Sequence, residues 1–224
     1  MKKLQIGSMP KIATDVENAF DRLRVNLSFC CDRIKTIMIT SSGSGEGKTF
    51  VSMGLWKRMS EAGIPTLMID CDLRNSQVIS RYNIYGAEGL DGVTQYLSGK
   101  AELEDVLYET DVHNGYLLPV TSLVEKPEIL LASGRFSQMI KKSKNEFGCV
   151  IIDTPSIASS PDAVSIAPYC DGAMIVVRSA STSRESVCDC VQALQCAGTP
   201  LLGIVLNSFD ANNKSSAFYY HHRK

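Results

Sequence analysis

The feature that most constrains the fold of this chain is a glycine-rich segment, SSGSGEGKT at 41–49, between an apolar run and a helical pattern. Gly43, Gly45 and Gly47 allow the backbone to fold around an anion with its N–H groups pointing inward. Strand, glycine-rich loop and helix in this order predict a P-loop. The loop is a variant, because Ser42 stands where the strict pattern has glycine.

Two side chains at the end of this loop predict a site for a nucleotide and its metal ion. Lys48 can reach the β- and γ-phosphates of a nucleoside triphosphate, and the Thr49 hydroxyl can bind Mg²⁺. The helix that follows presents its positive end to the same phosphates. We therefore expect a magnesium–nucleotide site at this loop.

Short apolar runs recur from residue 36 onward and predict the strands of a parallel sheet. Each run is continuously apolar rather than alternating, as expected when both faces of a sheet are covered. Helical patterns at 48–61, 128–143 and 183–197 separate the runs. This order predicts an α/β fold with a doubly wound, mainly parallel sheet. The runs are TIMITS (36–41), PTLMID (65–70), GYLLPV (115–120), GCVIID (148–153), GAMIVV (172–177) and LLGIVLN (201–207).

The length of 224 residues fits one domain of this kind. Apolar residues at helical spacing predict a further helix over about 14–30, before the first of these strands. The polar C-terminal stretch lacks a core-forming pattern and predicts a flexible tail. We expect a single P-loop domain over 1–209 and a tail over 210–224.

Three carboxylates follow predicted strands at the edge of the sheet where the P-loop lies. Asp70 and Asp72 end one strand, and Asp153 ends another. The carboxyl ends of parallel strands line the crevice in which ligands bind. Asp153 fits the Walker B acid that holds Mg²⁺, and one of the other two acids can serve as a base or be a turn residue. Arg74 follows them and can stabilise phosphate charge, join an interface or lie at the surface.

The charge balance excludes a general attraction to nucleic acid or anionic lipid. Lys and Arg number 23 and Asp and Glu 24, a formal net charge of −1, so we expect no nucleic-acid partner. The N-terminal apolar run is too short for a secretory signal, and no run approaches the ~18 residues that cross a bilayer. We expect a cytoplasmic protein whose eight cysteines, none in a C-x-x-C pair, stay reduced.

Three motifs together resemble those of a known family. SSGSGEGKT, LMIDCDLR and VIIDTP are similar to the Walker A, Walker A′ and Walker B motifs of the bacterial protein-tyrosine kinase (BY-kinase) family of capsule and exopolysaccharide synthesis. The likeness spans nearly the whole chain and includes the segment at 125–133, Asp162 and Asn207. Septum-positioning and partition ATPases resemble the same fold, but they carry a lysine where this chain has Gly43.

The resemblance implies a stand-alone, ATP-dependent tyrosine autokinase that phosphorylates Tyr219 and Tyr220 in the tail of another subunit. The catalytic residues that it implies are Lys48, Asp70, Asp72 and Asp153. Among the acids we favour Asp70 as the base. The metal ligands that it implies are Thr49, Asp72 and Asp153. The nucleotide-binding residues that it implies are Gly43, Ser44, Gly45, Glu46, Gly47, Lys48, Thr49, Phe50 and Asn207.

The family resemblance also implies cofactors and partners. The cofactors are ATP and Mg²⁺. The partners are a membrane adaptor of the chain-length-regulator type, further copies of the chain and a cognate tyrosine phosphatase. The adaptor activates the kinase and recruits it to the inner face of the membrane.

The helix motif that supports a ring in this family is matched only in part by this chain. The family helix motif that supports a ring reads Glu, two residues, Arg, two residues, Arg, and this chain has Asn18, Asp21 and Arg24 there. Glu17 and Arg22 lie one position away, which is about 100° around a helix. The oligomeric state is therefore open.

Two other functions are open at this stage. One is an ATP-hydrolysing dimerisation switch of the septum-positioning or partition type, which Gly43 and the short polar tail disfavour. The other is a non-catalytic, nucleotide-sensing regulator of polysaccharide assembly, which binds ATP without turnover. Phosphotyrosine formation distinguishes the kinase from both.

Overall fold

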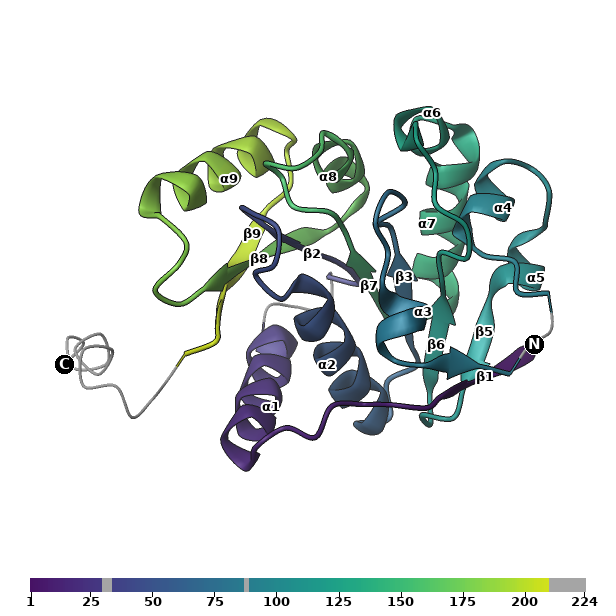
Figure 1. The fold of residues 1–224 in the computed structure, drawn as a ribbon, viewed down its shortest axis with the longest axis horizontal. Coiled ribbons are helices and arrows are strands. Elements are labelled where there is room, and N and C mark those ends of the chain that lie inside the picture. The colour runs from purple at the N-terminus through teal and green to yellow at the C-terminus, as the bar shows by residue number, and fades with distance from the viewer. Residues whose placement is uncertain (30–33, 87–88, 210–224) are drawn as a thin grey trace.

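The chain folds around one mainly parallel β-sheet (Figure 1). The structure, a computed structural model, describes residues 1–29, 34–86 and 89–209. Within these residues nine strands form the sheet in the order β4-β1-β5-β6-β3-β7-β2-β8-β9. The strands are β1 (Lys2–Ile6), β2 (Thr36–Ser41), β3 (Thr66–Asp70), β4 (Ile84–Tyr85), β5 (Tyr108–Thr110), β6 (Gly115–Leu118), β7 (Cys149–Asp153), β8 (Gly172–Arg178) and β9 (Leu201–Asn207).

Helices cover both faces of the sheet, as the doubly wound prediction requires (Figure 1). Apolar residues of α1 and α2 form one core against the sheet, and those of α4, α5, α7, α8 and α9 form a second core on its other face. Coverage of both faces explains why β2, β3 and β7 are buried along their whole length. The helices are α1 (Thr14–Phe29), α2 (Lys48–Glu61), α3 (Val78–Arg81), α4 (Val93–Leu97), α5 (Leu103–Val106), α6 (Pro127–Leu131), α7 (Gly134–Glu146), α8 (Asp162–Ile166) and α9 (Arg184–Cys196), with a 3₁₀ turn at Ala167–Tyr169.

The six strands predicted from apolar runs are confirmed as β2, β3, β6, β7, β8 and β9. β2 pairs in parallel with β7 on one side and with β8 on the other. β3 pairs in parallel with β7, in a register that sets Asp70 opposite Asp153. The sheet therefore brings these two carboxyl groups to the end of β2, where the glycine-rich loop begins.

The sheet extends beyond the predicted strands through β1, β4 and β5. These strands have five, two and three residues, which is too short to show a periodic pattern. β1 pairs in parallel with β5 and antiparallel with β4, both of which lie far along the chain. Leu4, which is 1% exposed, is the side chain that β1 buries.

The prediction of one helix over 128–143 is wrong. The structure has two helices there, α6 and α7, with a break at Ala132 and Ser133. The Ser133 side chain accepts a hydrogen bond from the backbone N–H of Phe136 and so caps α7. By contrast, the helices predicted over 14–30, 48–61 and 183–197 correspond to α1, α2 and α9, and residue 30 lies outside the described part.

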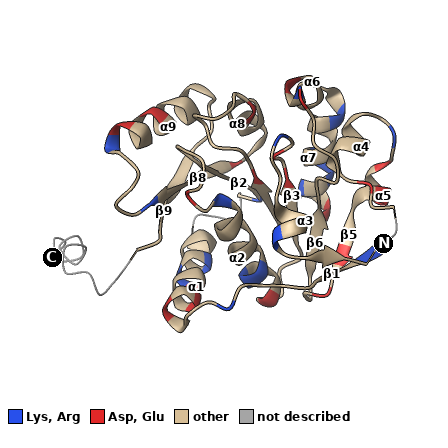
Figure 2. Ribbon diagram, viewed as in Figure 1, with Lys and Arg blue, Asp and Glu red and all other residues tan. Residues whose placement is uncertain are grey.

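Acidic and basic residues alternate over the helices, and neither sign gathers on one side in this view (Figure 2). Within the described residues, no helix is both long and apolar enough to cross a bilayer. The six cysteines of this part are free thiols, as expected. The boundary expected between domain and tail falls where the described residues end, so it stays a prediction.

Candidate active site

The glycine-rich loop owes its shape to two residues in the left-handed backbone region. Gly45 and Gly47 have φ angles of 78° and 98°, which strain any residue with a Cβ atom. At Gly47 a Cβ atom would also lie 2.0 Å from Nδ2 of Asn207. Only glycine fits at this position, so the loop can make the tight turn that a phosphate cradle needs.

Asn207, at the end of β9, holds the loop from outside. Its Nδ2 group donates a hydrogen bond of 2.8 Å to the backbone carbonyl of Glu46. Because the peptide group is planar, fixing this carbonyl also fixes the direction of the Gly47 N–H. Asn207 was predicted to bind nucleotide, and the structure places it on the backbone of the phosphate loop.

The Glu46 side chain turns back into its own loop. Its carboxylate accepts hydrogen bonds from Ser42 Oγ at 3.1 Å and from the Gly43 N–H at 3.0 Å. The side chain is 6% exposed. Glu46 was also predicted as a nucleotide-binding residue, and the structure places its carboxylate inside the loop.

Asp153, the predicted Walker B acid, lies against the start of α2. Its carboxylate accepts hydrogen bonds from Thr49 Oγ1 at 2.7 Å and from Ser52 Oγ at 2.9 Å. Thr49 and Ser52 are three residues apart in one helix, so they share the face that looks toward β7. The sequence analysis missed Ser52, although its helical spacing from Thr49 is a signal that could have found it.

Asp70 lies beside Asp153 and is enclosed more completely than expected. It is 0% exposed, and one carboxylate oxygen accepts a hydrogen bond from Ser76 Oγ. The other oxygen accepts the Asp72 N–H at 3.2 Å. Asp72 itself is only partly buried. Of the two candidate bases, Asp72 is therefore the more accessible, and Ser76 is a contact that the sequence analysis did not identify.

The three carboxyl groups differ from ordinary surface acids in their proton affinity. Burial, together with the charge of Asp153, raises the pKa of Asp70 to about 8. Burial raises the pKa of Asp153 to about 6, against the lowering effect of the Thr49 and Ser52 hydrogen bonds. Burial also raises the pKa of Asp72, partly offset by the Asn75 N–H and the Lys48 charge. Such shifts are common where acids serve in proton transfer or hold cations.

Arg74 bridges three segments of the same chain. Its Nε and Nη2 contact the Asp162 carboxylate at 2.7 and 3.3 Å. Nη2 also lies 2.7 Å from Glu128 of α6, and Nη1 donates to the Glu125 carbonyl. The Asp162 side chain is 1% exposed. None of the three readings open from the sequence included these internal contacts: Arg74 is exposed at the surface and ties the loop after β3 to α6 and α8.

A cavity of about 600 Å³ opens on the glycine-rich loop. The loop forms one wall, and the segment between β8 and α9 forms another. A volume of this size suits a small-molecule ligand. The lining residues are Ser42, Gly43, Ser44, Gly45, Glu46, Ile157, Ala158, Arg178, Ser181, Thr182, Ser183, Ser186, Asp189 and Cys190.

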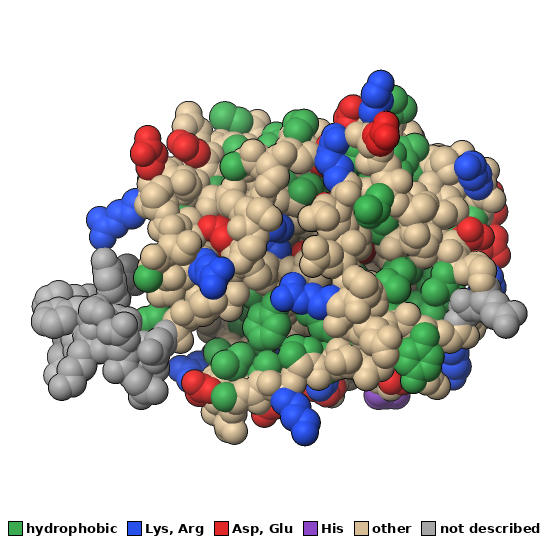
Figure 3. Space-filling view, in the orientation of Figure 1, with side chains coloured by type: hydrophobic (Ala, Val, Ile, Leu, Met, Phe, Trp, Pro, Cys, Tyr) green, Lys and Arg blue, Asp and Glu red, His purple; other side chains and the backbone are tan. Residues whose placement is uncertain are grey.

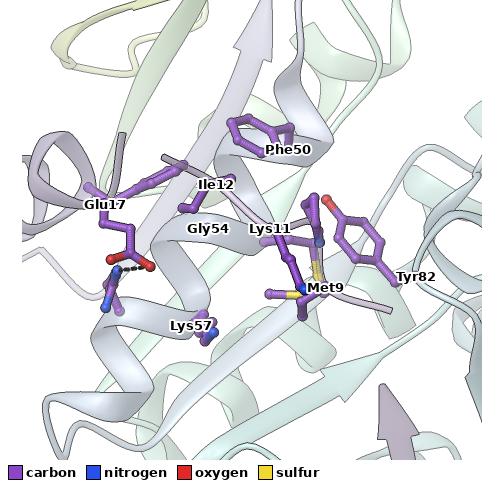
Figure 4. Close-up of a pocket in the computed structure, with 12 residues that line it drawn as sticks. Met9, Lys11, Ile12, Glu17, Phe50, Gly54, Lys57 and Tyr82 are labelled. Carbon is purple, nitrogen blue, oxygen red and sulfur yellow. Dashed lines mark ion pairs between the residues drawn. The ribbon is translucent and has the colours of Figure 1, made fainter. Parts of the chain in front are cut away.

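A second cavity, of about 410 Å³, lies between the segment 9–12 and helices α1 and α2 (Figure 4). Apolar side chains gather over these two helices, with lysines and arginines around them (Figure 3). The Phe50 ring lines this cavity and contacts the Phe20 ring, with centroids 5.7 Å apart. Phe50 was predicted to bind nucleotide, which stays a prediction; in the structure its side chain lines this second cavity.

The acidic residues of α1 are engaged within the chain. Arg58 of α2 lies 3.3 Å from Glu17, the pair marked in Figure 4, and 3.9 Å from Asp21. Both acids had been considered for a subunit contact on the sequence. Asn18 and Arg22 are exposed on the same helix, while Tyr219 and Tyr220, the expected phosphate acceptors, lie outside the described residues.

Comparison with known proteins gives the family. The AAA domain family matches residues 34–195. Tyrosine-protein kinase CpsD of Streptococcus agalactiae is 36% identical over 220 residues, which are 98% of this chain and 94% of that relative. This chain belongs to the bacterial tyrosine-protein kinase family.

Solved structures agree with membership of the tyrosine-protein kinase family. The kinase domain of Escherichia coli tyrosine kinase ETK matches with a TM-score of 0.82 and 26% identity, covering 90% of this chain and 80% of that one. The septum site-determining protein MinD of Pyrococcus horikoshii, complexed with Mg-ADP, matches with a TM-score of 0.66 and 25% identity, covering 77% of this chain and 69% of that one. The P-loop fold is thus confirmed, and the dimerisation-switch alternative is not favoured.

Proposed function

We propose that this chain is an ATP-dependent protein-tyrosine autokinase that phosphorylates Tyr219 and Tyr220 in the tail of another copy. In the cell it regulates capsular or exopolysaccharide synthesis or export. One observation carries the proposal: a phosphate loop faces two paired strand-end carboxylates in a chain that is 36% identical, over 98% of its length, to a tyrosine-protein kinase. The mechanism below follows from the residues at that site.

The residues at the loop fit ATP and Mg²⁺. Glycine-rich backbone and Lys48 supply N–H groups and a positive charge for the phosphates. Thr49 and Asp153, already 2.7 Å apart, offer the hydroxyl and carboxylate oxygens that Mg²⁺ prefers. Within the described residues, no three His, Cys, Asp or Glu side chains form a ready-made metal cluster. Mg²⁺ at phosphate sites is commonly held by one or two carboxylates together with phosphate oxygens and waters.

The protein residues position the reactants and balance charge. Mg²⁺ held by Thr49 and Asp153 would neutralise negative charge on the phosphate oxygens. Lys48 adds a second positive charge and draws Asp72 and Asp153 toward their ionised forms. Positioning and charge stabilisation account for most of the catalysis in phosphoryl transfer.

The acceptor tyrosine must lose a proton, since its hydroxyl has a pKa near ~10. Asp70 is the base that we favour: its pKa of about 8 makes its ionised form a stronger base than an ordinary aspartate, and only that ionised form can accept the tyrosine proton. Ser76 now donates to one Asp70 oxygen, so a tyrosine hydroxyl has to displace that contact. Asp72 is the alternative. Asn substitution at the base lowers kcat and leaves ADP affinity intact, whereas Asn substitution at a metal ligand weakens binding of Mg-nucleotide.

The adaptor, the phosphatase and the location remain part of this proposal. We propose that a membrane adaptor activates the kinase and brings it from the cytoplasm to the inner face of the membrane, and that a tyrosine phosphatase reverses the modification. Self-association is required for phosphorylation of one copy by another. Arg58 pairs with Glu17 and Asp21 of its own chain, and the two acidic side chains are 47% and 48% exposed, so these surface pairs leave both acids accessible to another copy.

The test is phosphotyrosine formation by purified protein with Mg-ATP, with and without the cytoplasmic segment of a candidate adaptor. Lys48→Met is expected to abolish labelling, because it removes the phosphate-binding charge. Lys57→Met is the matched control, since Lys57 lies in the same helix but lines the second cavity. Labelling of Lys48→Met at the parent rate contradicts the proposal.

A further inference from the structure

A buried carboxylate within the phosphate loop requires an explanation. Glu46 is 6% exposed, and a buried negative charge is costly unless hydrogen-bond donors satisfy it. Among the described residues no ion pair involves Glu46. Its donors are instead two groups of its own loop, Ser42 Oγ and Gly43 N, and the hydroxyl of Thr182. Thr182 is therefore the only one of these three donors from outside the loop.

Thr182 is itself fixed at the junction of β8 and α9. Its Oγ1 accepts the N–H of Arg178, the last residue of β8, at 3.1 Å. Its own N–H donates to the Arg178 carbonyl at 3.1 Å. The next residue, Ser183, caps α9 by accepting the Ser186 N–H at 3.0 Å. A strand end and a helix start thus hold this hydroxyl in place, pointing at Glu46.

Glu46 is consequently held from two sides by elements distant in the sequence. Thr182 binds its carboxylate, and Asn207 of β9 binds its backbone carbonyl. Both the loop and the segment that carries Thr182 line the same cavity of about 600 Å³. The two contacts orient the peptide groups on either side of Glu46, which belong to the backbone expected to surround a phosphate.

We propose that Thr182 is a positioning residue whose hydroxyl, acting through the Glu46 carboxylate, holds the phosphate loop in its nucleotide-binding shape. The proposal rests on the proposed function in that this loop is the one that binds the phosphates of ATP. Without the Thr182 hydroxyl, the Glu46 carboxylate loses a donor. The carboxylate is then better hydrated if it turns toward solvent in the cavity. In that position its negative charge repels the phosphates of a nucleotide.

The test compares ADP affinity among variants of the full chain, by titration with a fluorescent ADP analogue. Thr182→Val keeps the shape of the side chain and removes the hydroxyl, and Thr182→Ser keeps the hydroxyl. Thr199→Val is the matched control, because the Thr199 hydroxyl is buried and has no hydrogen-bond partner among the described residues. Melting temperatures of all variants separate lost binding from lost folding.

We expect Thr182→Val to weaken ADP binding about tenfold, the typical effect of losing one hydrogen bond to a charged group. Thr182→Ser and Thr199→Val are expected to stay within about twofold of the parent. If Thr182→Val is too unstable to purify, Glu46→Gln serves as the second test, since it removes the carboxylate at constant size and is likewise expected to weaken ADP binding.

A double-mutant cycle decides whether the effect passes through Glu46. Thr182→Val is expected to change ADP affinity much less in a Glu46→Gln background than in the parent. An undiminished effect in that background overturns the proposal, as does Thr182→Val binding ADP as tightly as the parent. The readout of this test is ADP binding. A parent that binds ADP but forms no phosphotyrosine therefore contradicts the kinase proposal without contradicting the role of Thr182.

Discussion

At the scale of single residues, Asp70 has the most unusual environment in the site. It lies at the end of β3 with no exposed surface, next to Asp153 on the paired strand. Among the residues that the structure describes, the Ser76 hydroxyl and the Asp72 N–H are its hydrogen-bond donors. Its pKa of about 8, set chiefly by burial, means that the folded state retains a proton that an exposed aspartate gives up near pH 4.

This proton makes stability depend on pH in a defined direction. Between the ordinary pKa of 3.8 and the folded pKa of about 8, the folded state binds a proton that the unfolded chain has lost, so raising the pH destabilises the fold. We expect the melting temperature without Mg²⁺ to fall between pH 5 and pH 8. Each kcal/mol lost lowers it by about 2–4 °C in a domain of this size.

The comparison that tests this prediction is Asp70→Asn, which is neutral at every pH. Its melting temperature is expected to decline less over the same pH range and to exceed that of the parent at pH 8. Glu185→Gln, at an exposed position of α9, is expected to follow the parent curve. Parallel curves for Asp70→Asn and the parent would show that Asp70 does not hold this proton.

At the scale of elements, the sequence predicted what depends on local pattern. Continuous apolar runs predicted β2, β3, β6, β7, β8 and β9, because buried parallel strands are apolar on both faces. The glycine spacing predicted the loop before α2, since only glycine fits the backbone at Gly47. The break between α6 and α7 was not predicted, because the apolar pattern continues across it. The sign of the break is a single capping hydrogen bond, made by the Ser133 side chain at the start of α7.

That capping bond leads to a stability prediction for α7. Ser133→Ala leaves the Phe136 N–H at the start of the helix without its side-chain acceptor and is expected to lower the free energy of unfolding by about 1 kcal/mol. Urea denaturation measures the change. Gln138→Ala, at an exposed position in the same helix, is expected to have little effect. Equal losses in both variants would mean that Ser133 is not the cap.

In the site, as among the elements, the sequence predicted the residues that belong to local motifs but not their distant partners. Lys48 and Thr49 could be named because the loop motif fixes their spacing, and Asp153 because it ends an apolar strand. The structure brings Thr49 and Asp153 into contact. Thr182 could not be named, because it lies 136 residues from Glu46 and only the order of the strands brings them together. Serine and threonine are common in loops, so such a partner carries no signal of its own.

At the scale of the whole molecule, helix α2 connects the phosphate loop with the second cavity. One end of α2 carries the phosphate loop, and the Phe50 ring at the same end faces the second cavity, between α1 and the segment 9–12. β9 holds the loop through Asn207 and leads directly into the tail. The proposed transfer between copies requires the tail tyrosines of one molecule to enter the active site of another.

The measurement that tests the central claim most directly is a mixing experiment read by mass spectrometry of the tail. A Tyr219→Phe, Tyr220→Phe variant supplies an intact site without acceptors, and Lys48→Met supplies acceptors without a working site. The two are incubated together and apart with Mg-ATP and the adaptor segment. We predict phosphate on Tyr219 or Tyr220 of the Lys48→Met chain in the mixture only. If the parent autophosphorylates under the same conditions but the mixture carries no phosphotyrosine, transfer between copies is contradicted. If the parent carries no phosphotyrosine either, the kinase proposal itself is contradicted.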